Sequence, residues 1–231
     1  PDLQAYLASS QTDDQTMSTA QQALEQEFRA FAGIRQIYNQ IGFVDAAGNE
    51  VVRIQTNADG ISGLASERQL QNIGDRSYFQ EIISTAPGEI YVSSVELSGE
   101  DGQLETMSNG SYRPVIRYGT PVVYSGQIVG AVVAEFLVDR FLSQVETGRQ
   151  PVFLVDEDGY YLYHPDETKR WSRQLQNEVT LTSDMSPEVV RQILTDSNGT
   201  VTTTGNFISY LSLQLPNYPG TWHLGLIKSR Q

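Results

Sequence analysis

The residues of this sequence that are best suited to chemistry are arginines, tyrosines and hydroxyl side chains between positions 72 and 118. Arg76 opens a predicted helix that also carries Tyr78 and Phe79. Tyr91 and Ser93 alternate on a predicted strand, so their side chains are expected on one face. The whole group consists of Asn72, Arg76, Tyr78, Phe79, Tyr91, Ser93, Arg113, Arg117 and Tyr118.

Guanidinium groups among aromatic rings indicate a binding site for a small organic anion. Arg117 follows Arg113 by four residues on the next predicted strand, so both are expected on one face. A guanidinium binds a carboxylate through two parallel hydrogen bonds, and a partly buried guanidinium without a partner is costly. The ligand-binding residues predicted on this basis, and by the family resemblance given below, are Arg76, Tyr78, Phe79, Tyr91, Ser93, Arg117 and Tyr118.

Two other functions are possible interpretations of this sequence: an aromatic cage that uses some of the same residues, and a protein-binding module that uses no small-ligand site. Tyr78, Phe79, Tyr91 and Tyr118 can be interpreted as an aromatic cage for an amine or quaternary ammonium, with Asp139 or Glu135 as counter-charge. The arginines argue against that cage. Alternatively, the chain binds a protein partner and no small ligand.

The composition argues against catalysis, metals and cofactors. The chain has no cysteine, and its two histidines are His164, which precedes Pro165 after a predicted strand, and His223, which lies within a predicted strand; both positions favour structural roles. It lacks the phosphate-binding, dinucleotide-binding and zinc-protease motifs, and the calcium-like run Asp156–Gly159 lacks the remaining ligands. A formal net charge of −13 excludes nucleic acid and anionic membrane surfaces as expected partners.

A repeated hairpin indicates the elements that position these residues. Asp45-Ala46-Ala47-Gly48 and Asp156-Glu157-Asp158-Gly159 stand 111 positions apart (156 minus 45), each between two strand-like runs. Asp opens such a turn, and Gly supplies its positive φ. The repeat predicts two similar α+β modules in tandem.

Periodicity supplies the remaining elements. Helices are expected near residues 75–85, 139–146 and 186–194, with Ala86-Pro87-Gly88 ending the first. A polar loop or lid is expected over 98–110. A hairpin is expected over 152–163, and strands are expected at 38–45, 50–56, 89–94, 113–124, 127–138, 199–204, 207–215 and 221–227.

The first 37 residues predict one long helix, with Met17, Leu24, Phe28, Phe31 and Tyr38 at helical spacings. Its polar first half indicates either a helix that projects beyond its domain or an ordinary amphipathic helix with a frayed start. The predicted domains are therefore a helix over 1–37, a first module over 38–148 and a second over 149–231. No apolar run reaches the length of a membrane span, so the sequence is interpreted as a soluble piece of a longer protein.

Several motifs resemble the double-Cache (tandem PAS-like) family of bacterial sensor domains over most of residues 20–228. They are Leu70-Gln71-Asn72-Ile73-Gly74-Asp75-Arg76-Ser77-Tyr78-Phe79-Gln80, Gly88-Glu89-Ile90-Tyr91-Val92-Ser93, Pro114-Val115-Ile116-Arg117 with Thr120-Pro121-Val122, Gly126-Gln127-Ile128-Val129-Gly130, and the two Asp-x-x-Gly hairpins.

The resemblance implies a fold, a location and a function. The fold is α+β, a long N-terminal helix followed by two PAS-like modules, each a central antiparallel sheet flanked by helices. The location is the extracytoplasmic part of a bacterial histidine kinase, chemoreceptor or diguanylate cyclase, held by flanking transmembrane helices outside this sequence. The implied partners are a small carboxylate in the membrane-distal first module and a second copy through the N-terminal helix. The chain lacks the Trp-Tyr pair that follows the Arg in the amino-acid-binding subgroup, which favours other carboxylates.

Overall fold

A computed structural model describes residues 2–9, 14–35, 38–57, 61–100, 103–104, 106, 110, 112–138 and 150–229. The chain divides into two compact units, Pro1–Val138 and Asp139–Gln231. The boundary predicted at residues 148 and 149, and the short helix predicted over 139–146, both involve residues 139–149, which lie outside the described residues.

The N-terminal segment differs from the single helix that the sequence predicts. It contains two helices, α1 (Asp2–Ser9) and α2 (Asp14–Arg35). Leu7 of α1 is buried in one apolar cluster with Leu24 and Phe28 of α2, and the Tyr6 ring contacts the Phe43 ring at 6.2 Å. A straight helix would hold Leu7 about 30 Å from Phe28 at 1.5 Å per residue. The two helices therefore pack together because folding α1 back buries its apolar side chains.

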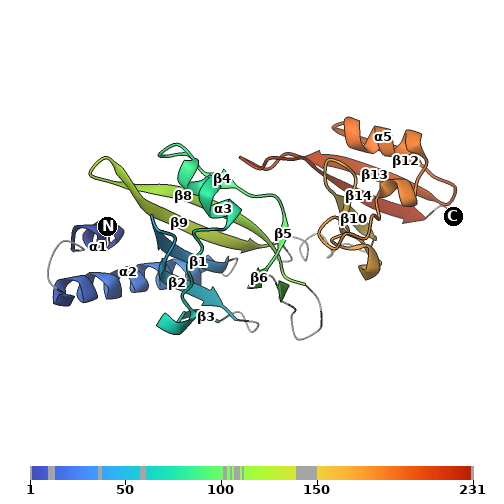
Figure 1. Cartoon of the computed structure of the whole chain (residues 1–231). Coiled ribbons are helices and arrows are strands. Elements are labelled where there is room, and N and C mark those ends of the chain that lie inside the picture. Colours follow the sequence, from blue (N-terminus) through green and yellow to red (C-terminus); the bar gives the residue numbers. More distant parts are fainter. Residues whose placement is uncertain are drawn as a thin grey trace. The chain divides into compact units, whose positions relative to one another are not determined.

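The first unit is built on an antiparallel sheet in the order β3-β2-β1-β9-β8-β4, with β5 also paired to β8 (Figure 1). A small separate hairpin, β6 with β7, follows β5. The bounds are β1 (Tyr38–Asp45), β2 (Glu50–Thr56), β3 (Ser62–Leu64), β4 (Tyr91–Val92), β5 (Glu96–Leu97), β6 (Gly99–Glu100), β7 (Gln103–Leu104), β8 (Pro114–Tyr124) and β9 (Gln127–Leu137), with a 3-10 turn η1 at Glu67–Gln69.

Helices pack against both faces of this sheet (Figure 1). On one face α2 packs against Ile41, Phe43, Val52 and Ile54. On the other face α3 (Ser77–Ser84) packs Phe79 and Ile82 against Val44, Ala131 and Val133, in a cluster of their own. Consecutive strand residues point to opposite faces, so Phe43 belongs to one core and Val44 to the other.

A glycine permits the close approach of α3 to β8. A Cβ on Gly119 would lie 2.3 Å from Cδ1 of Ile82, which is fully buried. The sequence predicts a helix over 75–85, and the observed helix begins two residues later and ends one residue earlier.

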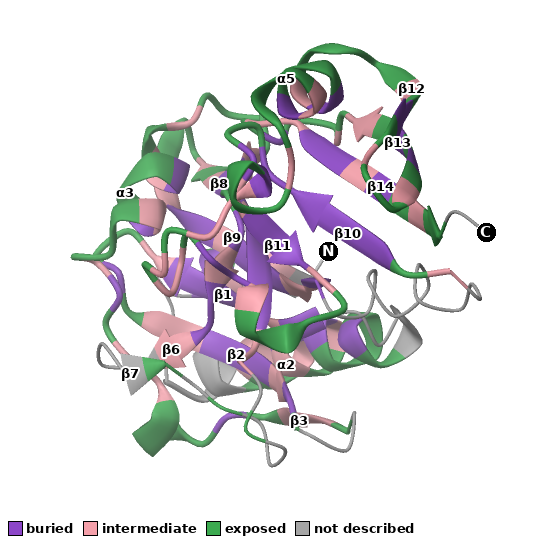
Figure 2. Cartoon of the chain, turned by 90° about the vertical axis from the view of Figure 1, so that its right-hand side faces the viewer, coloured by how far each residue is buried: buried purple, intermediate pink, exposed green. Residues whose placement is uncertain are grey.

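The second unit has a sheet in the order β11-β10-β14-β13-β12 with α5 packed against it. Figure 2 shows buried residues in purple along β10 and β11, whose side chains are all buried. Its bounds are β10 (Val152–Val155), β11 (Tyr161–Tyr163), η2 (Glu167–Lys169), η3 (Leu181–Ser183), α5 (Pro187–Thr195), β12 (Asn198–Thr202), β13 (Asn206–Leu213) and β14 (Trp222–Ser229).

The two predicted turns are confirmed and have the same internal hydrogen bonds. Asp45 Oδ1 accepts from the backbone N–H groups of Ala47 and Asn49, at 2.9 and 2.8 Å. Asp156 Oδ1 accepts from those of Asp158 and Tyr160, at 3.1 and 2.9 Å. The glycines have φ of +86° and +85°. The α+β class with antiparallel sheets is likewise confirmed.

Candidate functional site

A cavity of about 290 Å³ lies on the α3 side of the first sheet. Strands β1, β2, β8 and β9, the start of α3 and the segment around β5 to β7 contribute its walls. The described residues that line it are mostly polar or charged: Asn39, Gln40, Glu50, Arg53, Gln55, Gln71, Ile73, Arg76, Ser77, Tyr78, Glu96, Leu97, Ser98, Gly99, Leu104, Arg117 and Glu135.

One row of paired residues crosses four strands and forms part of this lining. Gln55 on β2 is opposite Gln40 on β1, Gln40 is opposite Glu135 on β9, and Glu135 is opposite Arg117 on β8. Residues directly opposite each other share a face of the sheet, so these four side chains lie on the cavity face.

A β-bulge adds a fifth polar group to this row. The pairing of β1 with β9 shifts between Tyr38 and Gln40, which leaves Asn39 as an extra residue. Asn39 Nδ2 donates to Glu135 Oε2 at 3.0 Å, and Arg113 Nη1 donates to Asn39 Oδ1 at 2.9 Å. The bulge therefore connects Arg113 with the buried carboxylate.

Arg117 is a buried cation held by two carboxylates. Its Nε donates to Glu135 Oε1 at 2.7 Å, and its Nη1 is in contact with Glu96 Oε2. Arg117 and Glu135 are 7% and 2% exposed. Burial by itself would lower the pKa of Arg117, but the negative charges of Glu135 and Glu96 outweigh it and raise the pKa above its ordinary value. Arg117 is therefore always charged.

A second ion pair stands on the opposite wall. Arg53 Nη1 lies 3.1 Å from Glu50 Oε2, and both side chains are less than a tenth exposed. Arg53 Nη2 donates to the backbone carbonyl of Gln69 at 2.7 Å, while Glu50 accepts from the N–H of Gln71 at 2.9 Å. These bonds attach the segment before α3 to the sheet.

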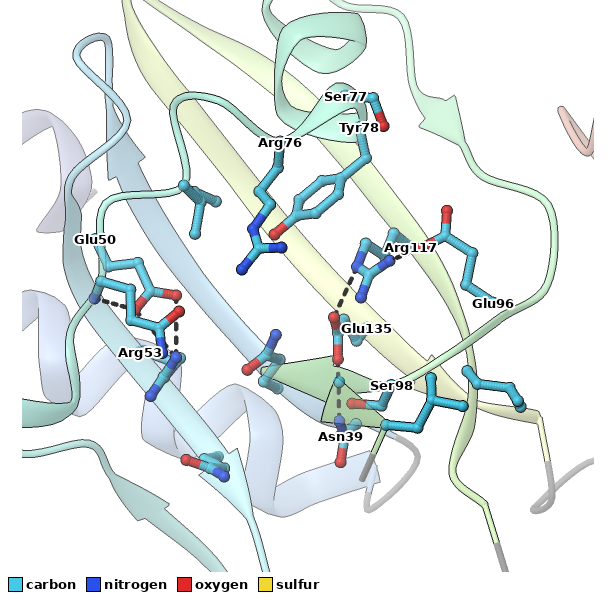
Figure 3. A pocket seen from close by; sticks show the side chains of 17 residues that line it. Asn39, Glu50, Arg53, Arg76, Ser77, Tyr78, Glu96, Ser98, Arg117 and Glu135 are labelled. Carbon is cyan, nitrogen blue, oxygen red and sulfur yellow. Dashed lines mark hydrogen bonds and ion pairs between the residues drawn. The ribbon is translucent and has the colours of Figure 1, made fainter. Parts of the chain in front are cut away.

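Arg76 extends into the space between these two ion pairs (Figure 3). Within the part of the chain that the structure describes, its guanidinium has no hydrogen-bond or ion-pair partner, in contrast to Arg53 and Arg117. The backbone of Arg76 precedes the first turn of α3, where it is the N-cap residue.

The segment that carries Arg76 is fixed on the first Asp-x-x-Gly turn. Asn72 Nδ2 donates to the Ala47 carbonyl at 3.0 Å and to Asn49 Oδ1 at 2.7 Å. The Ile73 N–H donates to the Gly48 carbonyl at 2.8 Å. Asn72, which the sequence places in the binding cluster, is thus a positioning residue rather than part of the cavity wall.

Tyr78 places its ring against Arg117, whose Cζ lies 4.4 Å from the ring centroid. Burial, with Glu135 and Glu50 nearby, outweighs the two arginines and raises the pKa of the Tyr78 hydroxyl to about 12. Tyr78 is therefore a neutral hydrogen-bonding group at physiological pH.

The structure brings together Arg76, Tyr78 and Arg117 of the predicted site residues, and it places the others elsewhere. Phe79 is 1% exposed in the core beneath α3, and Ser93 is buried with its Oγ accepting from the Arg117 N–H at 3.0 Å. Tyr91 pairs with Gly119 at the sheet edge, outside the lining; burial and a hydrogen bond with Glu81 raise its pKa.

Tyr118 requires a correction, because it points to the opposite face of the sheet. Its ring contacts Phe136 at 4.7 Å, and Phe136 in turn contacts Tyr38 on the α2 side. Adjacent residues of a strand point to opposite faces, so Arg117 and Tyr118 cannot both enter one cavity.

Sequence reasoning missed most of the polar lining contributed by the strands, including Gln40, Glu50, Arg53, Gln55 and Glu96. The available signal was polar residues that alternate with apolar ones, as in Arg53-Ile54-Gln55. Glu135 was considered only as a counter-charge for an amine; Asp139, its alternative, lies outside the described residues.

The histidines have structural surroundings. His223 is buried, with Nδ1 3.0 Å from Ser212 Oγ, and His164 Nδ1 accepts from the Asp166 N–H at 3.0 Å. Within the described residues, no group of three or more His, Cys, Asp or Glu side chains is placed to hold a metal ion. Among the helices that the structure describes, none is both long and apolar enough to cross a membrane.

An antiparallel sheet with a long helix on one face, and a polar cavity beside a short helix on the other, is consistent with a PAS-like sensor domain. Residues 6–224 match the family model of the bacterial histidine kinase sensor domain. The chain belongs to this family. A search of curated proteins finds no match.

Solved structures support the same fold. A domain assigned to a sensory box/GGDEF family protein of Vibrio parahaemolyticus has a TM-score of 0.83 and 22% identity, over 99% of this chain and 83% of that one. The extracellular domain assigned to histidine kinase vpHK1S-Z8 has a TM-score of 0.80 and 21% identity, over 99% and 81%. The sensory domain of Campylobacter jejuni chemoreceptor Tlp3 with isoleucine bound has a TM-score of 0.58 and 12% identity, over 99% and 77%.

These comparisons confirm the resemblance to Cache-type sensors. The chain is an extracellular or periplasmic sensor domain of a bacterial membrane receptor, and its role is signal transduction.

Proposed function

We propose that the first unit senses a small organic carboxylate, which binds to Arg76 in the cavity. The observation that carries this proposal is the contrast among the three arginines of the lining. Arg53 and Arg117 are neutralised by Glu50, Glu96 and Glu135, whereas Arg76 has no ion partner among the described residues. A guanidinium directed into a polar cavity is suited to bidentate binding of a carboxylate.

An Arg76→Ala variant tests this function. Isothermal titration calorimetry with a panel of organic acids identifies one that binds the unmodified chain. Since a hydrogen bond to a charged group contributes about 1.5–3 kcal/mol, the variant is expected to bind that acid about 10- to 100-fold more weakly. Arg68→Ala, an exposed arginine outside the lining, is the matched control and should bind like the unmodified chain. Unchanged affinity in Arg76→Ala would contradict the proposal.

The aromatic cage for an amine receives less support. Phe79, Tyr91 and Tyr118 lie outside the cavity lining, and one face of the Tyr78 ring is covered by Arg117. A cage needs several free ring faces around one cation. A site filled by the protein's own side chains would favour a protein-binding module without a small ligand. This site is instead an open cavity of about 290 Å³.

The signal is proposed to pass through β1 and β2, because these strands line the cavity on one face and pack against α2 on the other. Gln40 and Gln55 line the cavity, while Ile41 and Ile54, the next residues on β1 and β2, pack against α2. A ligand shifts such an equilibrium only by its differential affinity for the two states. The β6–β7 segment contributes Gly99 and Leu104 to the lining. Closure of this segment over the ligand is the proposed source of the difference in affinity between the two states.

Dimerisation through α2 is a further part of the proposal. Phe31 of α2 contacts Tyr38 at 5.5 Å and is 46% exposed, so it offers apolar surface on this helix to a second copy. Sedimentation equilibrium should give a dimer for the unmodified chain and a larger monomer fraction for Phe31→Glu. Gln26→Glu, exposed on the same helix, is the control and should leave the dimer unchanged. A monomeric unmodified chain would overturn this part.

A further inference from the structure

We infer that the ligand is a polyhydroxylated carboxylic acid, a sugar acid, rather than an amino acid or an acid with an apolar chain. This inference rests on the proposed function of Arg76 and concerns the rest of the ligand. It follows from the charges and the carboxamides of the cavity wall.

The charged side chains of the described lining are ion-paired, except at Arg76. Arg53 is paired with Glu50. The second network contains Arg113 and Arg117 as cations and Glu96 and Glu135 as anions, connected through Asn39. Arg76 is therefore the arginine of the described lining that has no ion partner.

This ion pairing favours an anion over a zwitterion as the ligand. An ammonium group needs a carboxylate to hold it, but Glu135 already accepts from Arg117 and Asn39, and Glu50 accepts from Arg53 and Gln71. Glu96 is engaged by Arg117 and its side chain is 41% exposed, so solvent weakens its attraction for a ligand. A ligand with one carboxylate and no amino group fits this arrangement.

The wall beside these ion pairs carries two free carboxamides. Gln40 and Gln55 are opposite each other on β1 and β2, both are partly buried, and both line the cavity. Among the residues that the structure describes, their side-chain amides have no hydrogen-bond partner, and they are therefore available to a ligand. Ser77 and Ser98 add hydroxyl groups to the lining.

Carboxamides and hydroxyl groups are complementary to ligand hydroxyls. Each amide offers a donor and an acceptor, and each hydroxyl offers both as well. An apolar ligand would instead remove the amides from water without replacing their hydrogen bonds, which is unfavourable. The apolar side chains of the described lining are Ile73, Leu97 and Leu104, and the remaining residues are polar, charged or glycine.

Six probes of similar size separate the contributions in calorimetry on the 231-residue chain. Gluconate, glucuronate and galactonate carry the carboxylate and the hydroxyls; hexanoate lacks the hydroxyls; glucitol lacks the carboxylate; and isoleucine is a zwitterion with an apolar side chain. At least one sugar acid is expected to bind at least about 10-fold more tightly than hexanoate, glucitol and isoleucine, because each unreplaced hydrogen bond reduces affinity by about that factor.

Gln55→Met and Gln40→Met test the contacts themselves, since methionine keeps the approximate shape and removes the amide. Each should weaken sugar-acid binding about 10-fold and leave hexanoate binding unchanged or stronger. Thermal unfolding of both variants verifies that they are folded. If one variant does not fold, the other provides the same comparison.

The outcomes distinguish this inference from the proposed function. Hexanoate that binds as tightly as the sugar acids, but more weakly to Arg76→Ala, overturns the inference and leaves the carboxylate sensor intact. Tight binding of isoleucine also overturns it. Sugar-acid binding that is insensitive to Arg76→Ala overturns the proposed function. No binding by any of the three sugar acids at millimolar concentration overturns the inference.

Discussion

Glu135 is a buried carboxylate within the apolar strand β9, between Ala134 and Phe136. It receives hydrogen bonds from Arg117 on β8 and Asn39 on β1, so it joins three strands through one side chain. Removing one member of a buried ion pair is costly, because the remaining charge stays buried without its partner.

Glu135→Ala is therefore expected to lower the free energy of unfolding by about 3 kcal/mol, measured by urea denaturation. The double variant Arg117→Met with Glu135→Leu should lose less, since Glu96, the carboxylate that then lacks its partner, is 41% exposed and can be hydrated. Glu89→Ala, at an exposed position, is the control. A loss below about 0.5 kcal/mol for Glu135→Ala, the range of ordinary surface changes, would show that the network does not stabilise the unit.

At the scale of elements, the first Asp-x-x-Gly turn supports the segment that leads to α3. Gly48 has φ +86°, and a Cβ at this position would lie 2.3 Å from Cα of Gly74. The positive φ explains the glycine, while the close approach explains how the turn holds Asn72 and, through it, Arg76. A Cβ at the equivalent Gly159 would meet no atom closer than 3.5 Å, so of the two turns it is the first that has this close approach.

Gly48→Ala and Gly126→Ala separate these two effects within one unit. Gly126 has φ +79° and open space around its Cα, so its replacement should cost only the conformational term, about 1 kcal/mol. Gly48→Ala should cost clearly more in urea denaturation and should also weaken ligand binding, because the segment carrying Arg76 must shift. Equal losses of stability in the two variants would contradict the role assigned to the contact with Gly74.

At the scale of the whole molecule, each unit has its own buried core. Clusters around Phe43 and around Phe79 fill the first unit, and a cluster around Phe153 fills the second. All the lining residues that the structure describes lie from position 39 to position 135. The proposed division of labour is therefore that the first unit binds the ligand and the second couples it to the membrane.

A chain limited to residues 1–138 tests this division. It is expected to fold and to bind the acid identified above with the affinity of the longer chain, as measured by calorimetry. Arg76→Ala in this shorter chain should weaken binding as it does in the longer one. A folded fragment that does not bind would show that the site needs the second unit.

Local patterns were sufficient to predict many of the elements. The runs at 38–45 and 50–56 became β1 and β2 with the same bounds, and the Asp-x-x-Gly turns formed as expected. These features depend on side-chain alternation and on the φ of one glycine, which are properties of neighbouring residues. The helix predicted over the first 37 residues was wrong as a single element, because packing between α1 and α2 is a long-range contact.

The sequence by itself determined the class of fold, the repeated turns and the arginine at the start of α3, since each follows from residues close together in the chain. Only the tertiary structure decided the composition of the site. Asn39 and Glu135 meet across 96 positions, and the row from Gln55 to Arg117 exists because three strand pairings have one register. A shift of one residue would turn every side chain of a strand to the other face. For the same reason Arg117 lines the cavity and Tyr118 does not.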